Sequence, residues 1–257
     1  MAEDAAREGK QDPRGEVYRR RIYLGVVDCA STSFDPDEAR SLLDPTESSR
    51  LSSFSSDSRK AEFLAGRLLA KHLASSALGI EAKRVSIERG PEGGPYVAGG
   101  FSLSIAHSGG VVLCAVARFG VGVDIERIKP RRDIDGIAGY AFAQTEVADL
   151  RMQPAMEREK RFYALWTLKE AHVKRLGLGL ASLRGCPSFE LGPGTALAAT
   201  GVGACAYLCF RLGSRFVAAI AHDFLSDEPE LRFLPRFAPP ADLSPLTLFA
   251  TSRGERR

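Results

Sequence analysis

Apolar and polar side chains alternate most clearly over residues 120–126, Gly-Val-Gly-Val-Asp-Ile-Glu. This period of two predicts a β-strand that buries Val121, Val123 and Ile125 on one face. Asp124 and Glu126 then stand side by side on the other face. Neighbouring carboxylates repel unless a cation lies between them, and Mg²⁺ suits one or two carboxylates plus water and substrate phosphates. Alone, Asp-x-Glu is better explained by an exposed strand edge before a basic turn, so the metal hypothesis depends on the surrounding residues.

A period of 3.6 predicts a helix over residues 60–78, with leucines at positions 64, 68, 69 and 73 and Gly79 as its stop. Arg67 and Lys71 are four residues apart and share one face of this helix. They form either a solvated cationic edge or a pair that binds phosphate, and nothing in the local sequence decides between the two.

A second long helix is predicted over residues 158–176. Lys169 falls in the middle of its broad apolar face, so its ammonium group must either reach the solvent or meet an anion. Glu170 and Lys174 lie at the rim of that face, four residues apart. They are either a surface ion pair or, with Asp124 and Glu126, a third oxygen ligand and a phosphate contact.

The other predicted elements repeat in order along the chain. Strands are expected at 22–27, 85–89, 101–105, 111–117, 188–191, 204–211 and 216–222, with helices at 35–43 and 145–150 and a short helix or a loop at 48–58. The order strand, helices, three strands occurs twice, which predicts an α+β fold of two similar halves with a ligand site in the cleft between them. The predicted boundaries are a disordered lead-in at 1–20, halves at 21–119 and 120–224, and a Pro-rich tail at 225–257 that drapes over the surface or is disordered.

Composition narrows the class of protein. The 257 residues are 44% hydrophobic and 26% charged, as in ordinary globular proteins. A net charge of +3 is too mild for bulk nucleic-acid binding, and no run approaches the roughly 20 apolar residues of a membrane span. The five cysteines contain no C-x-x-C pair and are expected to be reduced, without a zinc site. We therefore expect a cytoplasmic protein that binds neither nucleic acid nor a membrane.

The candidate chemistry lacks an internal nucleophile. His107 follows a predicted strand and precedes Ser108-Gly109-Gly110, where it could contact a phosphate or take up a proton, although a solitary loop histidine is more often structural. There is no phosphate-binding G-x-x-x-x-G-K-[ST] loop and no G-x-S-x-G motif. If the chain is an enzyme, its metal site should activate a bound phosphate ester toward a group on a second substrate.

Three motifs together resemble those of the Sfp-type 4′-phosphopantetheinyl transferases, in order and in spacing. They are Ala-His-Ser-Gly at 106–109, Gly-Val-Asp-Ile-Glu at 122–126 and Trp-Thr-Leu-Lys-Glu-Ala-His-Val-Lys at 166–174. Weaker matches occur at 63–67, 93–96 and 144–146. The resemblance runs from about residue 22 to residue 222. The motif at 122–126 followed by the motif at 166–174 is specific as a combination, although neither of these two motifs is specific alone.

The resemblance implies a monomeric pseudo-dimer of two α+β halves, with coenzyme A between them and Mg²⁺, or Mn²⁺, on its pyrophosphate. The reaction would move 4′-phosphopantetheine to a serine of an apo acyl or peptidyl carrier protein and release 3′,5′-adenosine bisphosphate. Carriers of fatty-acid, polyketide and non-ribosomal peptide synthesis all remain open. The alternatives are a Mg²⁺-dependent pyrophosphate hydrolase of the same fold and a non-catalytic module that binds coenzyme A or a carrier protein.

The resemblance also assigns roles to individual residues. Asp124, Glu126 and Glu170 would hold the metal, with Glu170 also the candidate base and Asp124 and Lys174 counted among the catalytic residues. Coenzyme A would be bound by Arg67, His107, Ser108, Lys169 and Lys174. Three departures from the family pattern affect coenzyme contacts: Ala106 replaces a serine, Gly94 replaces a lysine, and Ser48 and Ser49 replace basic residues.

Overall fold

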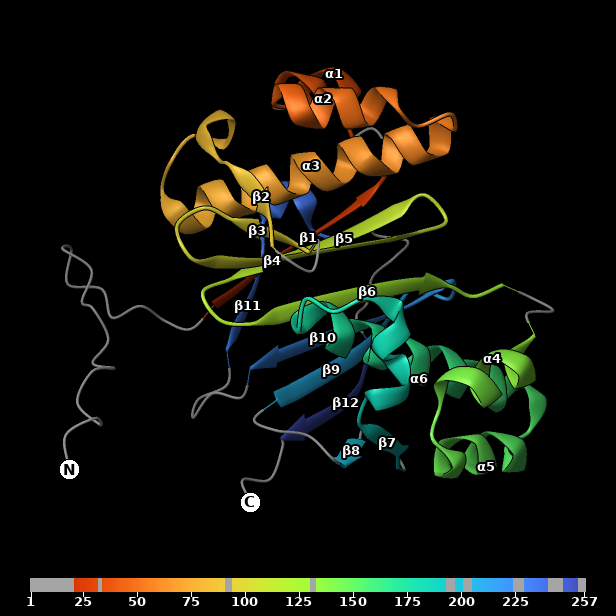
Figure 1. Cartoon of the computed structure of the whole chain (residues 1–257). Coiled ribbons are helices and arrows are strands. Elements are labelled where there is room, and N and C mark those ends of the chain that lie inside the picture. Colours follow the sequence, from red (N-terminus) through yellow and green to blue (C-terminus); the bar gives the residue numbers. More distant parts are fainter. Residues whose placement is uncertain are drawn as a thin grey trace, which may run out of the picture.

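The computed structural model describes residues 21–31, 34–90, 94–129, 133–192, 197–200, 205–223, 229–239 and 247–253. A six-stranded sheet has the order β11-β1-β5-β4-β3-β2, a four-stranded sheet has the order β12-β9-β10-β6, and β7 pairs with β8 (Figure 1). The strands are β1 (Arg21–Asp28), β2 (Ile87–Arg89), β3 (Pro95–Val97), β4 (Phe101–Ser108), β5 (Val111–Ala117), β6 (Val121–Arg127), β7 (Ser188–Leu191), β8 (Leu197–Thr200), β9 (Cys205–Leu212), β10 (Phe216–Asp223), β11 (Glu230–Phe233) and β12 (Thr247–Arg253). The helices are α1 (Pro36–Ser41), α2 (Pro45–Ser52), α3 (Asp57–Leu78), α4 (Ile134–Ala141), α5 (Gln144–Met152) and α6 (Ala155–Arg175).

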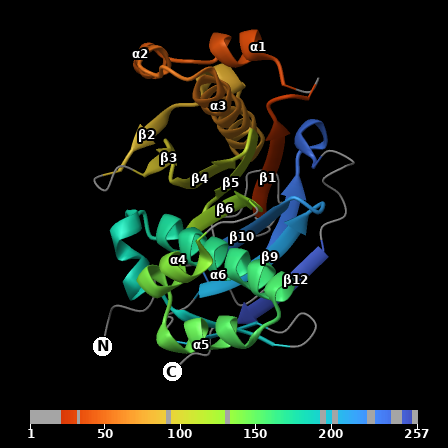
Figure 2. The same cartoon turned by 90° about the vertical axis from the view of Figure 1, so that its right-hand side faces the viewer.

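The elements form four layers, namely α3, the six-stranded sheet, the four-stranded sheet and α6, and an apolar cluster lies between each neighbouring pair. One cluster lies between α3 and the six-stranded sheet, with Leu68 and Val112 among its members. A second lies between the two sheets and contains Leu113 and Ile220. The third lies between the four-stranded sheet and α6, with α4 and α5 alongside, as the rotated view shows (Figure 2). The molecule is therefore a mixed α and β fold in which each sheet carries one long helix on its outer face.

Most of the predicted elements are confirmed where the apolar period is strong. The helix predicted at 60–78 is α3, and it ends at Gly79 in the left-handed conformation with φ of 71°. Of the serine-rich stretch at 48–58, the first part belongs to a helix, α2, whose start Asp44 and Glu47 cap reciprocally, and residues 53–56 form a non-helical connection to α3. The helix α4 and the short strands β3 and β8 were not predicted, and the expected lead-in at 1–20 lies outside the described residues. In the described part of the chain, none of the helices combines the length and the apolar character needed to cross a bilayer.

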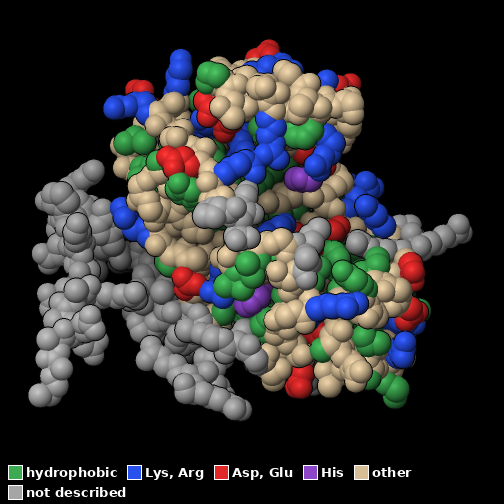
Figure 3. All heavy atoms as spheres, in the orientation of Figure 1, with side chains coloured by type: hydrophobic (Ala, Val, Ile, Leu, Met, Phe, Trp, Pro, Cys, Tyr) green, Lys and Arg blue, Asp and Glu red, His purple; other side chains and the backbone are tan. Residues whose placement is uncertain are grey.

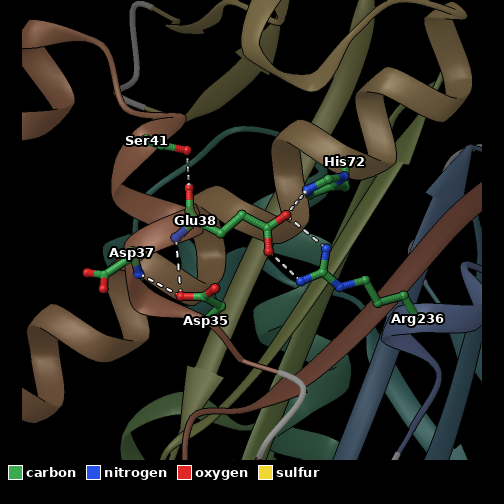
Figure 4. A network of polar contacts seen from close by, with 6 residues as sticks. All are labelled: Asp35, Asp37, Glu38, Ser41, His72 and Arg236. Carbon is green, nitrogen blue, oxygen red and sulfur yellow. Dashed lines mark hydrogen bonds and ion pairs between the residues drawn. The ribbon is translucent and has the colours of Figure 1, made fainter.

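The C-terminal segment is more than a surface tail. β11 pairs in parallel with β1 and β12 pairs with β9, so this segment supplies an edge strand to both sheets. In the short 3₁₀ turn η3 (Pro235–Phe237), Phe237 is buried against α3. Beside it Arg236 donates to both oxygens of Glu38, which also accepts a 3.1 Å bond from His72 Nε2 (Figure 4). The Pro-rich composition concealed these contacts because prolines lie between the strands and not within them.

The two sheets meet where β4 lies beside β6, and serine side chains of β4 hydrogen-bond there to the backbone of β6. The N–H groups of Val121 and Val123 donate to Ser102 Oγ (3.2 Å) and Ser104 Oγ (2.9 Å). Farther along, the N–H of Arg127 donates to Ser108 Oγ (3.0 Å). Ala106 occupies the remaining position of this series and is buried between the sheets. The serine that the family pattern expects at 106 would therefore face β6, and its absence removes a contact between the sheets.

Candidate functional site

β6 places its apolar and acidic side chains on opposite faces, as the alternation predicted, and its acidic face lies against α6. Val121, Val123 and Ile125 are buried between the sheets, whereas Asp124 is on the opposite face and is 5% exposed. Gly122 allows the close approach, because a Cβ atom there would lie 2.0 Å from the carbonyl oxygen of Ala171 in α6. The absence of a side chain at position 122 thus brings the acidic end of β6 next to the last turns of α6.

From α6, Lys174 and Glu170 face the β6 carboxylates. Lys174 Nζ donates to Asp124 Oδ1 at 2.7 Å, and Glu170 is 6% exposed. The interpretation of Glu170 and Lys174 as a surface ion pair is therefore wrong, since Lys174 pairs with Asp124 and Glu170 is buried. This cluster of Asp124, Glu126, Glu170 and Lys174 is called the acidic cluster below.

Burial and mutual repulsion shift the proton affinities of the acidic cluster. Burial raises the pKa of Asp124 to about 6, although Lys174 opposes this shift. Burial, followed by repulsion from Asp124, raises the pKa of Glu170 to about 7. One lysine does not fully neutralise these carboxylates, so the electrostatics of the cluster favour the binding of an additional cation.

The donor set suits a hard divalent cation, although no preformed cage is present. Asp124 Oδ2 is buried and has no hydrogen-bond partner, which is costly for a carboxylate oxygen unless a ligand supplies one. Asp124, Glu126 and Glu170 are all oxygen donors of the type that Mg²⁺ prefers. Over the described ranges, no three His, Cys, Asp or Glu side chains are already grouped closely enough to hold a metal ion. We infer that Asp124, Glu126 and Glu170 fit a cation by their chemistry and would close around it.

The raised pKa of Glu170 predicts a pH-dependent stability for the metal-free protein. Its folded pKa of about 7 lies above the ordinary value of 4.5, so this group favours folding below pH 4.5 and that contribution is lost as the pH rises through about 7. In the presence of a chelator, the melting temperature of Glu170→Gln should therefore fall less between pH 5 and pH 8 than the melting temperature of the parent. Glu159→Gln, on the same helix outside the acidic cluster, is the control. Identical slopes for Glu170→Gln and the parent would contradict the shift.

The six-stranded sheet contributes His107 and Ser108 from the end of β4, which extends past the predicted boundary at residue 105. His107 Nδ1 lies 3.2 Å from Glu62 Oε2, and its Nε2 lies 3.1 Å from an Arg59 guanidinium nitrogen. Burial lowers the pKa of His107, with Arg59 and Lys174 acting in the same direction and Glu62 opposing them. Ser108 Oγ lies 3.0 Å from Glu126 Oε2, which joins β4 directly to the acidic cluster.

Sequence reasoning missed Arg59, which lies in the first turn of α3. Its side chain is 54% exposed and contacts both His107 and Glu62. In the sequence, Arg59 is one of several charged residues at the start of a helix. Its contact with His107 becomes visible only in the folded chain. An exposed guanidinium beside a histidine is a suitable partner for a phosphate.

Arg67 and Lys71, farther along α3, are not solvated. Arg67 and Lys71 are 7% and 2% exposed, and their side-chain nitrogens lie 3.0 Å and 3.3 Å from the two oxygens of Glu47, itself 6% exposed. The solvated-edge alternative is therefore wrong. Glu47 comes from α2, so a buried ion-pair network fixes α2 on α3. In this arrangement Arg67 is engaged with Glu47, and its predicted contact with a coenzyme phosphate would require it to leave that pair.

Lys169 meets an anion, which was one of the two outcomes expected for it. It is 1% exposed, its Nζ lies 2.9 Å from Glu146 Oε2, and it donates to the carbonyl of Pro187 at 3.0 Å. The ammonium group lies over the rings of Phe142 and Phe189, 5.7 Å and 5.6 Å from their centroids. This enclosure argues against the predicted contact between Lys169 and coenzyme A, and we assign Lys169 to holding α5 and β7 on α6.

Lys169→Met should destabilise the fold by about 3 kcal/mol, because it leaves the Glu146 carboxylate buried without its cation. Lys160→Met is the matched control: it lies on the same helix, and its 3.4 Å pair with Glu157 is half-exposed. The control should cost less than about 1 kcal/mol. Chemical denaturation measures both, and equal losses in the two variants would contradict the assignment.

A pocket of about 520 Å³ lies beside the acidic cluster, between the β2–β4 region and the end of α6. It is lined by Gly90, Gly94, Pro95, Tyr96, Leu103, Ser104, Ile105, Lys174, Arg175, Leu176, Gly177 and Leu178. Lys174 belongs both to this lining and to the acidic cluster. On the face shown in Figure 3, Lys and Arg side chains gather over α3 beside a histidine. A ligand in this pocket would meet the cations Lys174 and Arg175 of α6 on one side and residues of β3 and β4 on the other.

Two models of known protein families match this chain. The model for the 4′-phosphopantetheinyl transferase superfamily matches residues 120–221, and the model for the 4′-phosphopantetheinyl transferase N-terminal domain matches residues 47–117. The chain belongs to the 4′-phosphopantetheinyl transferase superfamily. The two superfamily models divide the chain where β5 ends and β6 begins, so the acidic cluster lies in the matched segment 120–221 and His107 in the matched segment 47–117.

Curated relatives in the superfamily match part of the chain. A 4′-phosphopantetheinyl transferase of Bacillus subtilis is 35% identical over 46% of this chain and 53% of its own length. The HetI 4′-phosphopantetheinyl transferase of Nostoc is 31% identical over 46% of this chain and 53% of its own. The Sfp transferase of Bacillus subtilis is 40% identical over 30% of this chain and 34% of its own. The chain thus spans about half the length of the first two relatives.

A solved structure of Helicobacter pylori holo-[acyl-carrier-protein] synthase in complex with coenzyme A is also similar in part. It aligns with 37% of this chain and 97% of that chain, at 19% identity and a TM-score of 0.30. At that TM-score the likeness carries no weight for the fold or the site of the present chain.

Proposed function

We propose that this chain transfers the 4′-phosphopantetheine group of coenzyme A to a serine of an apo acyl or peptidyl carrier protein, with Mg²⁺ as its metal. The observation that carries the proposal is the acidic cluster, with its unpartnered Asp124 oxygen, beside a pocket that Lys174 also lines. The superfamily membership and the names of the curated relatives support the same reaction. Residues 21–119 and 120–224 would form the two halves of a pseudo-dimer with coenzyme A between them.

In this proposal Asp124, Glu126 and Glu170 hold Mg²⁺, or Mn²⁺, which when bound neutralises charge on the pyrophosphate of the coenzyme. Lys174 and His107 donate to coenzyme phosphates from opposite sides of the site, and Arg59 is added to this set because its exposed guanidinium touches His107. These donors offset the charge that develops on the leaving phosphate.

Glu170 is the group best placed to accept the proton of the attacking serine hydroxyl. Its pKa, raised to about 7 by burial and by neighbouring carboxylates, is close to the value expected of a base that works near neutral pH. The bond from the serine oxygen to the β-phosphorus of the pyrophosphate forms as the bond to the bridging oxygen breaks. The products are the carrier with 4′-phosphopantetheine joined to its serine by a phosphodiester, and 3′,5′-adenosine bisphosphate.

We propose that a single chain suffices for activity. His107 and Arg59 come from the first half and the acidic cluster from the second, so both sides of the site belong to the same polypeptide. A mass measurement in solution, combined with the specific activity at several protein concentrations, tests this. Activity that falls on dilution in parallel with loss of a dimer would contradict it.

Incubation with fluorescent coenzyme A, Mg²⁺ and a panel of apo acyl and peptidyl carrier proteins tests the reaction itself. Label on the carrier is the expected result, and it should disappear when a chelator removes Mg²⁺. Hydrolysis of coenzyme A without labelled carrier would instead indicate a pyrophosphate hydrolase. Binding of coenzyme A without turnover would indicate a non-catalytic module.

A further inference from the structure

Ser108, like Arg67 and Lys169, makes contacts within the chain that differ from the coenzyme contact that the family resemblance implies. It is 9% exposed, and its hydroxyl contacts two groups of β6. The N–H of Arg127 donates to Ser108 Oγ at 3.0 Å, and the hydroxyl lies 3.0 Å from Glu126 Oε2. Both contacts thus tie this hydroxyl to β6, and one of them is to a residue of the acidic cluster.

The proton of the hydroxyl has a defined place. An N–H group can only donate, so the contact with Arg127 uses a lone pair of Ser108 Oγ. An ionised carboxylate can only accept, so the single hydroxyl proton of Ser108 must point to Glu126. The backbone of β6 thus orients Ser108, and Ser108 in turn restricts the rotamer of Glu126.

We propose that Ser108 is a positioning residue that aims the Glu126 carboxylate at the divalent cation. This inference rests on the proposed function, in which Glu126 is a metal ligand. Groups that hydrogen-bond to metal-ligating carboxylates fix their orientation, and their loss commonly lowers metal affinity by about 10- to 100-fold. Because Ser108 belongs to β4 and Glu126 to β6, the first half of the chain helps to build the metal site of the second half.

Ser102 offers a matched control on the same strand. Its Oγ also accepts an N–H bond from β6, at 3.2 Å from Val121 N, and also lies near an acceptor, the Val121 carbonyl oxygen at 3.4 Å. Each serine therefore joins the two sheets by accepting one N–H bond from β6 and donating its hydroxyl to an acceptor on β6. Only Ser108 donates to a carboxylate, so a purely structural role predicts equal behaviour for Ser102→Ala and Ser108→Ala.

The test measures Mn²⁺ binding directly, from the electron paramagnetic resonance signal of free Mn²⁺, with and without coenzyme A. Ser108→Ala should raise the Kd for Mn²⁺ by about 10-fold or more, whereas Ser102→Ala should stay within about twofold of the parent. Ser108→Thr, which keeps the hydroxyl, should restore most of the affinity. Melting temperatures measured with a chelator should fall similarly in the two alanine variants. If Ser108→Ala fails to fold, Ser108→Cys replaces it, because a thiol is a weak donor of similar size.

Unchanged Mn²⁺ affinity in Ser108→Ala, or an equal loss in Ser102→Ala, would overturn the positioning role while leaving the proposed function intact. A parent protein that binds no Mn²⁺ with or without coenzyme A would overturn the metal site itself, and the positioning role with it. The failure of the inference and the failure of the proposed function therefore give different results.

Discussion

Asp124→Asn is expected to lower the rate of phosphopantetheine transfer by at least about 10²-fold, the usual effect of removing one charge-stabilising group from an active site. The asparagine keeps the shape of the side chain, but it removes the negative charge that pairs with Lys174 at 2.7 Å and the buried oxygen available to a cation. The measurement is the initial rate of carrier labelling over a range of Mg²⁺ concentrations, together with Mn²⁺ affinity.

Asp149→Asn is the control for this substitution. Asp149 also pairs with a cation, Arg161 at 2.9 Å, but on α5, and its side chain is 44% exposed. The control should label carriers at the parent rate. Full Mg²⁺-dependent activity in Asp124→Asn would remove Asp124 from the metal site.

Gly122→Ala is expected to destabilise the protein by more than about 4 kcal/mol, at the exceptional end of single substitutions. Its Cβ would lie 2.0 Å from the Ala171 carbonyl oxygen and 2.4 Å from the Arg175 nitrogen, and both are helix backbone atoms that cannot rotate away. Relief requires β6 and α6 to separate, which also withdraws Asp124 from Lys174. Chemical denaturation and the labelling rate, measured where the variant is still folded, should both fall.

Gly139→Ala makes the same chemical change where nothing lies within 4 Å of the new Cβ. Gly139 is in α4, where alanine is a better helix former than glycine, so this variant should be as stable as the parent or up to about 1 kcal/mol more stable. A Gly122→Ala variant that matches Gly139→Ala in stability would show that β6 and α6 do not depend on this close approach.

The sequence predicted those parts of the fold that depend on local periodicity. Strand β6, with its apolar and acidic faces, and helices α3 and α6 were readable because their apolar positions recur at 2 and 3.6 residues. The strands β3 and β8 have three and four residues, too few to show a period, and α4 is rich in small residues. The edge strands β11 and β12 were concealed by prolines that lie outside them.

The sequence pointed to the residues of the acidic cluster but not to the pairs that they form. The motifs brought Asp124, Glu170 and Lys174 to notice, yet Lys174 pairs with a residue 50 positions away, and no local spacing encodes that distance. Glu47 drew no attention, although its buried carboxylate determines where Arg67 and Lys71 point. Contacts between buried charges depend on how layers stack, so such contacts follow from the fold and not from the pattern along one element.

The most direct test of the central claim is the intact mass of an apo carrier protein after incubation with this chain, coenzyme A and Mg²⁺. A second carrier, in which alanine replaces the acceptor serine, serves as the control. The account predicts that the first carrier gains one phosphopantetheine group with release of 3′,5′-adenosine bisphosphate, and that the control carrier and Asp124→Asn gain none. Consumption of coenzyme A with no mass gain on any carrier, or equal modification of the alanine carrier, would contradict it.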